Sequence, residues 1–132
     1  MRKVLGYTAF IGLLILTGCS STESGGGGMT DSMLTPEQRF TLKDIKGETV
    51  SLDGVLAKSK AVLINFWATW CAYCIEEMPD LIKLQAKYQD KGFTLLGINA
   101  GESLEVASRY ADKAKINFPV LVDEEMTAAG VY

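Results

Sequence analysis

Two cysteines separated by two residues, Cys71 and Cys74, follow an apolar segment and open a helical pattern. Residues 61–66 form a short, almost continuous apolar run rich in branched side chains, which indicates a strand covered on both faces and placed centrally in a sheet. After Cys71, apolar residues recur near helical spacing to about Asp90, and Lys91-Gly92 supplies a stop signal. The sequence therefore predicts that the cysteine pair lies where a buried strand passes into a helix.

This position favours redox chemistry at the pair. At a helix N-terminus, unpaired backbone N–H groups and the helix dipole stabilise a thiolate, so Cys71 is the predicted nucleophile. Cys74 lies one helical turn further in, where we expect it to be less exposed and close enough to form a disulfide with Cys71. Cys74 would then attack a mixed disulfide at Cys71 and release the partner. A static disulfide or two inert buried thiols is the alternative interpretation.

Other uses of two such cysteines fit the sequence poorly. Haem attachment requires a histidine directly after the second cysteine, and that position is Ile75. A zinc site needs four ligands, whereas the chain contains no histidine and has only Cys19 besides this pair. The lack of histidine also excludes a Cys-His nucleophile pair. We expect no metal and no cofactor.

The segments before residue 61 predict a β-hairpin. Residues 40–42 and 49–52 alternate apolar with polar side chains, and residues 44–47 between them carry turn signals. After the cysteine helix, residues 93–99 read as a second buried strand. A strand, a helix and a strand in this order predict a right-handed unit with a parallel sheet.

The remaining segments predict one further helix and one further strand. The helix is expected over about residues 102–115 and the strand over 118–122, and residues 125–132 would begin another helix or turn.

The N-terminal residues 1–18 have the character of a secretion signal. A short basic start precedes an apolar run of about thirteen residues, fewer than the about 20 needed to span a bilayer. Leu16-Thr17-Gly18-Cys19 resembles the lipobox of bacterial lipoproteins, which implies cleavage before Cys19 and its lipidation. A plain secretory signal or an uncleaved amphiphilic N-terminus is the alternative. Residues 19–34 are small and polar, with four consecutive glycines, and are predicted to be a flexible tether.

Charge excludes one class of partner. Loss of Arg2 and Lys3 with the signal would reduce the 13 basic residues to 11 against 16 acidic ones, a net charge of −5. We expect no nucleic-acid partner.

Residues 40–132 resemble the TlpA/ResA branch of the thioredoxin-like superfamily. The resemblance rests on three matching segments and the second cysteine: Phe40-Thr41-Leu42, Asn65-Phe66-Trp67-Ala68-Thr69-Trp70-Cys71, Cys74, and Glu77-Met78-Pro79. It implies an α/β chain with a thioredoxin-like fold over residues 35–132, comprising an N-terminal β-hairpin and a helix-strand insert. Relatives continue into a cis-proline loop and a C-terminal ββα portion that this chain lacks, so we expect an incomplete domain with one edge of strand 61–66 exposed.

The resemblance also implies a function. The chain would be a membrane-anchored, extracytoplasmic thiol-disulfide oxidoreductase, reducing disulfides in exported proteins such as apocytochrome c and recharged by a membrane thiol-disulfide electron donor. Glu77 falls at a position where the family has a functional glutamate, and would pass a proton to the thiols. Trp70 would pack beside the disulfide and contribute to a docking surface, whereas Trp67 and Phe66 are expected in the core.

Two other functions remain open. The chain could be a catalytically silent lipoprotein fragment or binding module that keeps the motif without a working fold. A peroxidase of the peroxiredoxin type shares the broad fold, but it would place a single peroxidatic cysteine in a loop rich in proline and threonine. The sequence Trp70-Cys71 followed by Cys74 fits that pattern poorly.

Overall fold

The computed structural model describes residues 34–132. The predicted signal peptide, lipidated Cys19 and tether up to residue 33 lie outside the described residues. The elements, in chain order, are η1 (Pro36–Gln38), β1 (Thr41–Asp44), β2 (Thr49–Ser51), α1 (Leu52–Leu56), β3 (Ala61–Trp67), α2 (Ala72–Tyr88), η2 (Gln89–Lys91), β4 (Phe93–Ala100), α3 (Leu104–Ala114) and β5 (Val120–Asp123).

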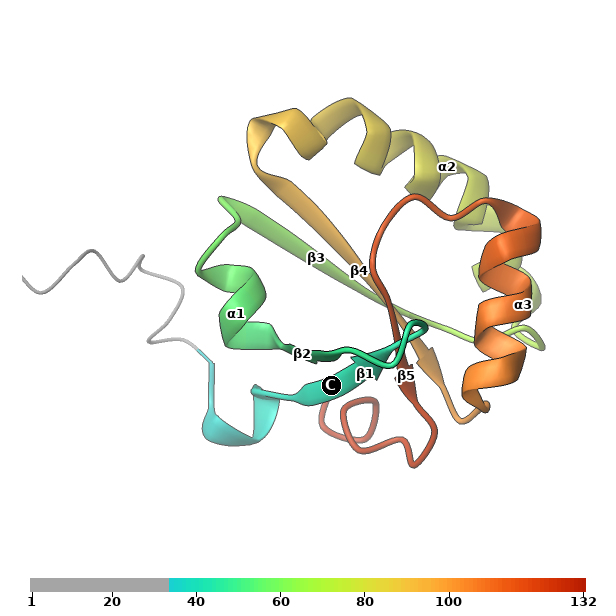
Figure 1. Ribbon diagram of the computed structural model, residues 1–132, viewed down its shortest axis with the longest axis horizontal. Coiled ribbons are helices and arrows are strands. Elements are labelled where there is room, and N and C mark those ends of the chain that lie inside the picture. Colours follow the sequence, from blue (N-terminus) through green and yellow to red (C-terminus); the bar gives the residue numbers. More distant parts are fainter. Residues whose placement is uncertain (1–33) are drawn as a thin grey trace, which may run out of the picture.

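These strands form one mixed sheet in the order β2-β1-β5-β4-β3 (Figure 1). Strands β3, β4 and β5 are parallel, whereas β1 runs antiparallel to both β5 and β2. The hairpin β1-β2 and the parallel unit β3-α2-β4 confirm the two predictions made from residue patterns. The architecture confirms the α/β fold class.

The predicted central position of strand 61–66 is wrong for the described residues. There β3 pairs only with β4, from Ala61 opposite Phe93 to Trp67 opposite Asn99, and it forms one edge of the sheet. Most of its side chains are half-buried, and Trp67 alone is fully buried. An apolar run shows that helices and loops cover the faces of a strand; it does not show how many strands lie beside it. Within residues 34–132 no strand pairs with the other side of β3, as the family resemblance implied for this edge.

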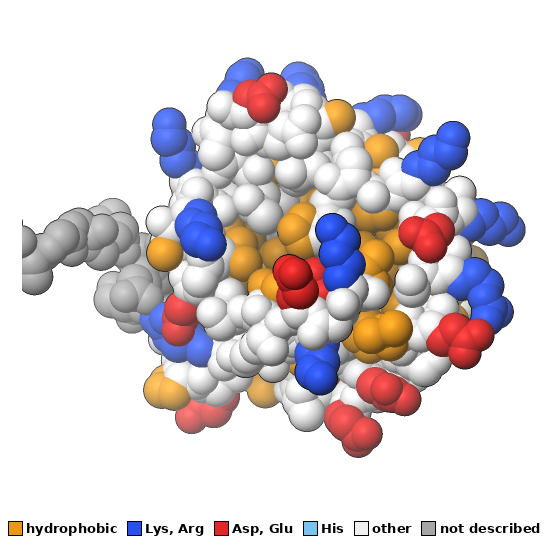
Figure 2. Space-filling model, viewed as in Figure 1, with side chains coloured by type: hydrophobic (Ala, Val, Ile, Leu, Met, Phe, Trp, Pro, Cys, Tyr) orange, Lys and Arg blue, Asp and Glu red, His pale blue; other side chains and the backbone are white. Residues whose placement is uncertain are grey.

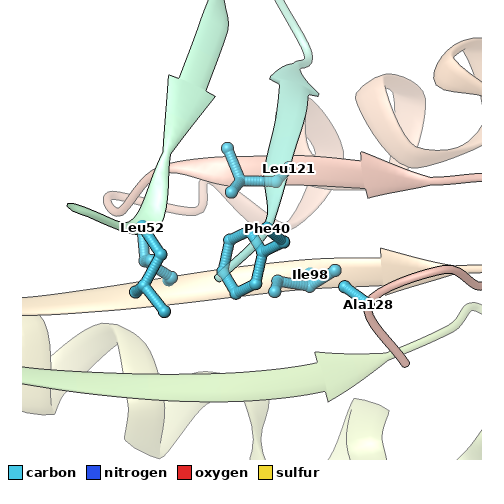
Figure 3. Packing of buried hydrophobic residues seen from close by; sticks show 6 residues of the cluster. Phe40, Leu52, Ile98, Leu121 and Ala128 are labelled. Atoms are coloured by element: carbon cyan, nitrogen blue, oxygen red, sulfur yellow. The ribbon is translucent and has the colours of Figure 1, made fainter. Parts of the chain in front are cut away.

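One face of the sheet packs against α1 and the C-terminal turns. Figure 3 shows Phe40, Leu52, Ile98, Leu121 and Ala128 converging from the residue before β1, from α1, β4 and β5, and from the segment after β5. Alternation along β4 directs Leu96 and Ile98 to this face and leaves Leu95 and Gly97 on the other. Residues far apart in sequence thus share one core, which anchors the hairpin to the parallel strands.

The other face is covered by α2 and α3 (Figure 1). Trp67 at the end of β3, Met78 on α2 and Ala111 on α3 belong to one buried cluster with Leu95 and Phe118. The Trp67 side chain is only 2% exposed, which confirms its predicted core position. Because Trp67 directly precedes the loop to the cysteines, this cluster fixes the starting point of that loop.

Helix α1 was not predicted, and it begins where the hairpin pattern was expected to continue. The side chain of Ser51 accepts a hydrogen bond from the backbone N–H of Gly54 at 3.2 Å. Such a cap satisfies an N–H group that has no partner within the helix, so the chain turns into a helix at Leu52. Because apolar and polar side chains alternate through residue 52, the sequence pattern did not indicate the start of this helix.

The segment after β5 adopts turns, one of the two forms predicted for residues 125–132. Buried Asp123 accepts hydrogen bonds from the backbone N–H groups of Thr127 and Ala129, both at 2.8 Å. Tyr132 lies beside the start of β1, where its hydroxyl donates to the carbonyl of Gln38 at 2.7 Å (Figure 1). These contacts return the chain to the hairpin.

Charged side chains of both signs are interspersed on the face shown in Figure 2, around a centre where hydrophobic side chains gather. A nucleic-acid site requires clustered basic residues, so this face does not have that character. The whole sequence carries a net charge of −3.

We expect Gly97→Ala to destabilise the chain, because a Cβ atom there would lie 2.7 Å from Cε2 of Phe118 and 3.2 Å from Nε1 of Trp67. Overpacking of this kind costs about 1–3 kcal/mol. Urea unfolding should show that loss, and Phe118→Leu combined with Gly97→Ala should recover part of it. Equal losses in the single and double variants would contradict the assigned clash.

Candidate active site

The candidate site lies at the carboxyl end of the parallel strands. Residues 68–71 connect the end of β3 to the start of α2, and the loop after β4 begins at the same edge of the sheet. Open α/β sheets bind and react at this edge, because loops from neighbouring strands meet there. The fold thus brings the cysteine motif next to residues that follow it by about 30 positions in the sequence.

Cys71 and Cys74 are joined in a disulfide, with their Cα atoms 5.3 Å apart. Cys71 is the N-cap of α2, and its Sγ accepts a hydrogen bond from the backbone N–H of Cys74 at 3.3 Å. The predicted strand-to-helix position of the pair is confirmed. Opening of the disulfide would leave the Cys71 sulfur at the end of the helix where N–H groups and the dipole stabilise negative charge.

The two cysteines have different surroundings. Cys74 packs against the buried cluster that contains Trp67 and Met78. Both cysteines are half-buried, so their exposure alone does not separate them. The contact with the core places Cys74 on the inner side of the pair; the order of attack at the two sulfurs stays a prediction.

One exposed aromatic side chain precedes each cysteine of the disulfide in the sequence. Trp70, directly before Cys71, is 75% exposed, and Tyr73, directly before Cys74, is 84% exposed. Large exposed aromatic rings are typical of surfaces that contact other proteins. The Trp70 ring is therefore accessible, as its predicted docking role requires, and the Tyr73 ring is accessible as well.

Glu77 lies one turn beyond Cys74 on α2, and its side chain faces the end of β3. Its Oε1 accepts a hydrogen bond from Nδ2 of Asn65 at 2.8 Å. The Oδ1 atom of Asn65 is buried, and has no hydrogen-bond partner within residues 34–132. Asn65 thus orients the Glu77 carboxylate, a contact that sequence reasoning missed.

A second carboxylate, Glu102, contacts the loop before Cys71. Its Oε2 accepts the backbone N–H of Thr69 and Nδ2 of Asn99, both at 2.8 Å, and its Oε1 accepts the Thr69 hydroxyl. Burial acts to raise the pKa of Glu102, but the hydrogen bonds from Thr69 and Asn99 outweigh it and hold the pKa below its usual value. Glu102 is therefore ionised at neutral pH.

Sequence reasoning did not single out Glu102. The order of the strands could have indicated it. Residues that follow the carboxyl ends of two neighbouring parallel strands lie close together, and Thr69 and Glu102 both occupy such positions.

The described residues offer neither a metal site nor a membrane-spanning helix. Within residues 34–132, no group of three or more acidic, cysteine or histidine side chains is placed to hold a metal ion. None of the helices in that range is both long enough and apolar enough to cross a membrane.

Two known proteins with similar sequences are named as a thiol-disulfide oxidoreductase and a thioredoxin-like protein. Thiol-disulfide oxidoreductase ResA from Halalkalibacterium halodurans is 32% identical over 93 residues, which cover 70% of this chain and 52% of the relative. Thioredoxin-like protein YneN from Bacillus subtilis is 40% identical over 101 residues, covering 74% of this chain and 56% of the relative. The chain spans about half the length of the curated relatives it matches.

A solved structure and a family pattern agree with these relatives. The crystal structure of a putative thiol:disulfide interchange protein DsbE from Chlorobium tepidum superposes with a TM-score of 0.64 at 28% identity, covering 71% of this chain and 64% of that one. The pattern of the AhpC/TSA family matches residues 35–132, almost all of the described part of the chain. The protein belongs to the AhpC/TSA family and has the thioredoxin-like fold that the resemblance implied.

Proposed function

We propose that the chain is a thiol-disulfide oxidoreductase whose redox centre is Cys71 and Cys74. The observation that carries this proposal is the pair itself: Cys71 caps α2, its sulfur receives an N–H from the helix, and Cys74 lies within disulfide distance on the core side. A purely structural disulfide would not require a helix N-terminus or exposed aromatic neighbours. The names of the relatives described above point to the same reaction.

The reaction consists of two displacements. In the dithiol form, the Cys71 thiolate attacks one sulfur of a partner disulfide, forming a mixed disulfide and releasing the other partner sulfur as a thiolate that takes up a proton. Cys74 loses its proton and attacks Sγ of Cys71. The mixed bond breaks, the partner leaves as a dithiol, and the Cys71–Cys74 disulfide remains. Two electrons have passed from the cysteine pair to the partner.

Glu77 is proposed to receive the proton that Cys74 loses. The hydrogen bond from Asn65 fixes the orientation of this carboxylate. Spacing of three residues along a helix places Cys74 and Glu77 on neighbouring positions of one face. Trp70 is proposed to contact the polypeptide that carries the substrate disulfide, because its ring is exposed directly before the nucleophile.

The cellular setting is proposed from the N-terminal sequence and from the resemblance to the TlpA/ResA branch. Cleavage before Cys19 and its lipidation would anchor the chain to a membrane on the extracytoplasmic side, with the tether holding the domain away from the lipid. Its substrates would be oxidised exported proteins, such as apocytochrome c. A membrane thiol-disulfide donor would return the pair to the dithiol form.

A redox titration tests the proposed reaction. We expect the chain carrying Cys19→Ser to show a single two-electron transition in glutathione buffers, followed by thiol trapping and mass spectrometry. Adding Cys74→Ser should accumulate a mixed disulfide at Cys71, and adding Cys71→Ser should prevent it, because the nucleophile is then absent. Two thiols reacting independently, as in the denatured chain, would refute the enzyme and favour a catalytically silent module.

Replacement of Glu77 by glutamine is expected to slow the second displacement and leave the first unchanged. Water has access to the exposed carboxylate, so we expect a loss of about tenfold, below the roughly 100-fold effect typical of general acid-base residues. Stopped-flow measurement of partner-thiol release separates the two steps. Glu76→Gln, the adjacent exposed glutamate, is the matched control. Equal rates in the two variants would remove Glu77 from the mechanism.

The anchor is tested in cells that perform lipoprotein processing. Cys19→Ser should abolish incorporation of labelled fatty acid and move the chain from the membrane fraction to the soluble fraction, because the acylated sulfur is lost. Cys74→Ser serves as the control that removes a different cysteine. Retention of label in the Cys19→Ser chain would exclude this residue as the lipid site.

A further inference from the structure

A tight turn sets the position of Cys71. The backbone N–H of Cys71 donates to the carbonyl of Ala68 at 3.1 Å, so Thr69 and Trp70 are the central residues of the turn. The Ala68 side chain is buried and fixes the start of the turn against the core. Any shift of Thr69 would therefore be passed to Trp70 and to the nucleophile itself.

Glu102 holds this turn from the neighbouring strand. Both of its carboxylate oxygens contact Thr69, one through the backbone N–H and the other through the hydroxyl. One of these oxygens also accepts Nδ2 of Asn99, which is buried at the end of β4 directly opposite Trp67. We call these three hydrogen bonds the Glu102 clamp. Because the acceptor is ionised, each bond is stronger than one between neutral groups.

The loop that carries Glu102 is also held in place. Gly101, directly before Glu102, has a φ of 74°, and its backbone N–H donates to the carbonyl of Asp123 at 3.0 Å. This bond ties the loop after β4 to the end of β5. The clamp therefore connects the turn before Cys71 to two adjacent strands of the sheet, and to no group that reacts during thiol exchange.

We propose that Glu102 is a positioning residue of the redox centre, which holds the turn Ala68–Cys71 so that Cys71 remains aligned with Cys74. This role rests on the proposed thiol-disulfide exchange. The disulfide and the clamp restrict the same short segment, so each lowers the loss of conformational entropy that accompanies formation of the other. By reciprocity, a clamp that is favoured by the disulfide must also favour disulfide formation.

The experiment measures the equilibrium between the protein dithiol with oxidised glutathione and the protein disulfide with two reduced glutathione molecules. The chain carrying Cys19→Ser is compared with the same chain bearing Glu102→Gln, Thr69→Val or both. Glutamine keeps the size of the side chain but loses the charge and one acceptor oxygen. Valine keeps the shape and the backbone N–H of Thr69 but loses the hydroxyl.

We expect Glu102→Gln to lower this equilibrium constant by roughly 3- to 10-fold, within the range of coupling between residues in one hydrogen-bond network. Thr69→Val should lower it less, and the double variant should fall short of the product of the two single effects. Thr69→Ser, which restores the hydroxyl, should return the constant to that of the parent chain. Glu105→Gln is the matched control, because Glu105 is an exposed glutamate that pairs with Arg109 on α3.

Unfolding of the oxidised and reduced forms in urea separates positioning from simple stabilisation. A purely structural clamp would lower the stability of both forms equally and leave the equilibrium constant unchanged, and that result would overturn the proposal. Independent, multiplicative effects of Glu102→Gln and Thr69→Val would also overturn it. Failure of the parent chain to show a two-electron transition would instead refute the proposed exchange reaction.

Discussion

The parallel pairing of β3 with β4 is the constraint on which the site depends. Seven consecutive residue pairs, from Ala61 with Phe93 to Trp67 with Asn99, fix the two strands in one register. This register places the ends of both strands at the same height, so the turn before Cys71 meets the loop that carries Glu102. A shift by one residue would reverse the faces of all the side chains on one strand and separate Trp67 from its core cluster. The geometry of the cysteines thus originates in backbone pairing some distance from the sulfur atoms.

The burial of Trp67 fixes the point at which the loop to Cys71 leaves β3. Gly97 leaves the space into which the rings of Trp67 and Phe118 fit, and Phe118 belongs to the segment that leads into β5. Three parallel strands therefore contribute to the placement of one indole ring. The contrast with Trp70, only three residues later and largely exposed, shows how sharply the chain passes from core to surface at this point.

Local patterns predicted the elements that carry the chemistry. The apolar run before Cys71 and the helical spacing after it are properties of neighbouring residues, so the strand-helix junction could be predicted directly. Strand order could not be predicted this way, because apolar character reports coverage of a strand's faces, and β3 proved to be an edge strand in the described part of the chain. Helix α1 was missed since one serine hydroxyl changed the backbone course within an alternating segment. The contacts of Glu77 with Asn65 and of Glu102 with Thr69 join residues distant in sequence, and only the sheet register brings them together.

The one-sided pairing of β3 has a consequence for the local dynamics of the redox centre. The Ala61 N–H points toward β4, where it donates to the carbonyl of Gly92, so alternation directs the amides of Val62, Ile64 and Phe66 to the open edge of the described sheet. Amide protons along this single strand should therefore alternate between slow and fast exchange with solvent. The covalent link between the core and the disulfide passes through a strand whose opening requires the loss of hydrogen bonds on one side only. Local opening of this strand would then cost less free energy than global unfolding. It would be the first opening reaction to change the surroundings of the cysteines.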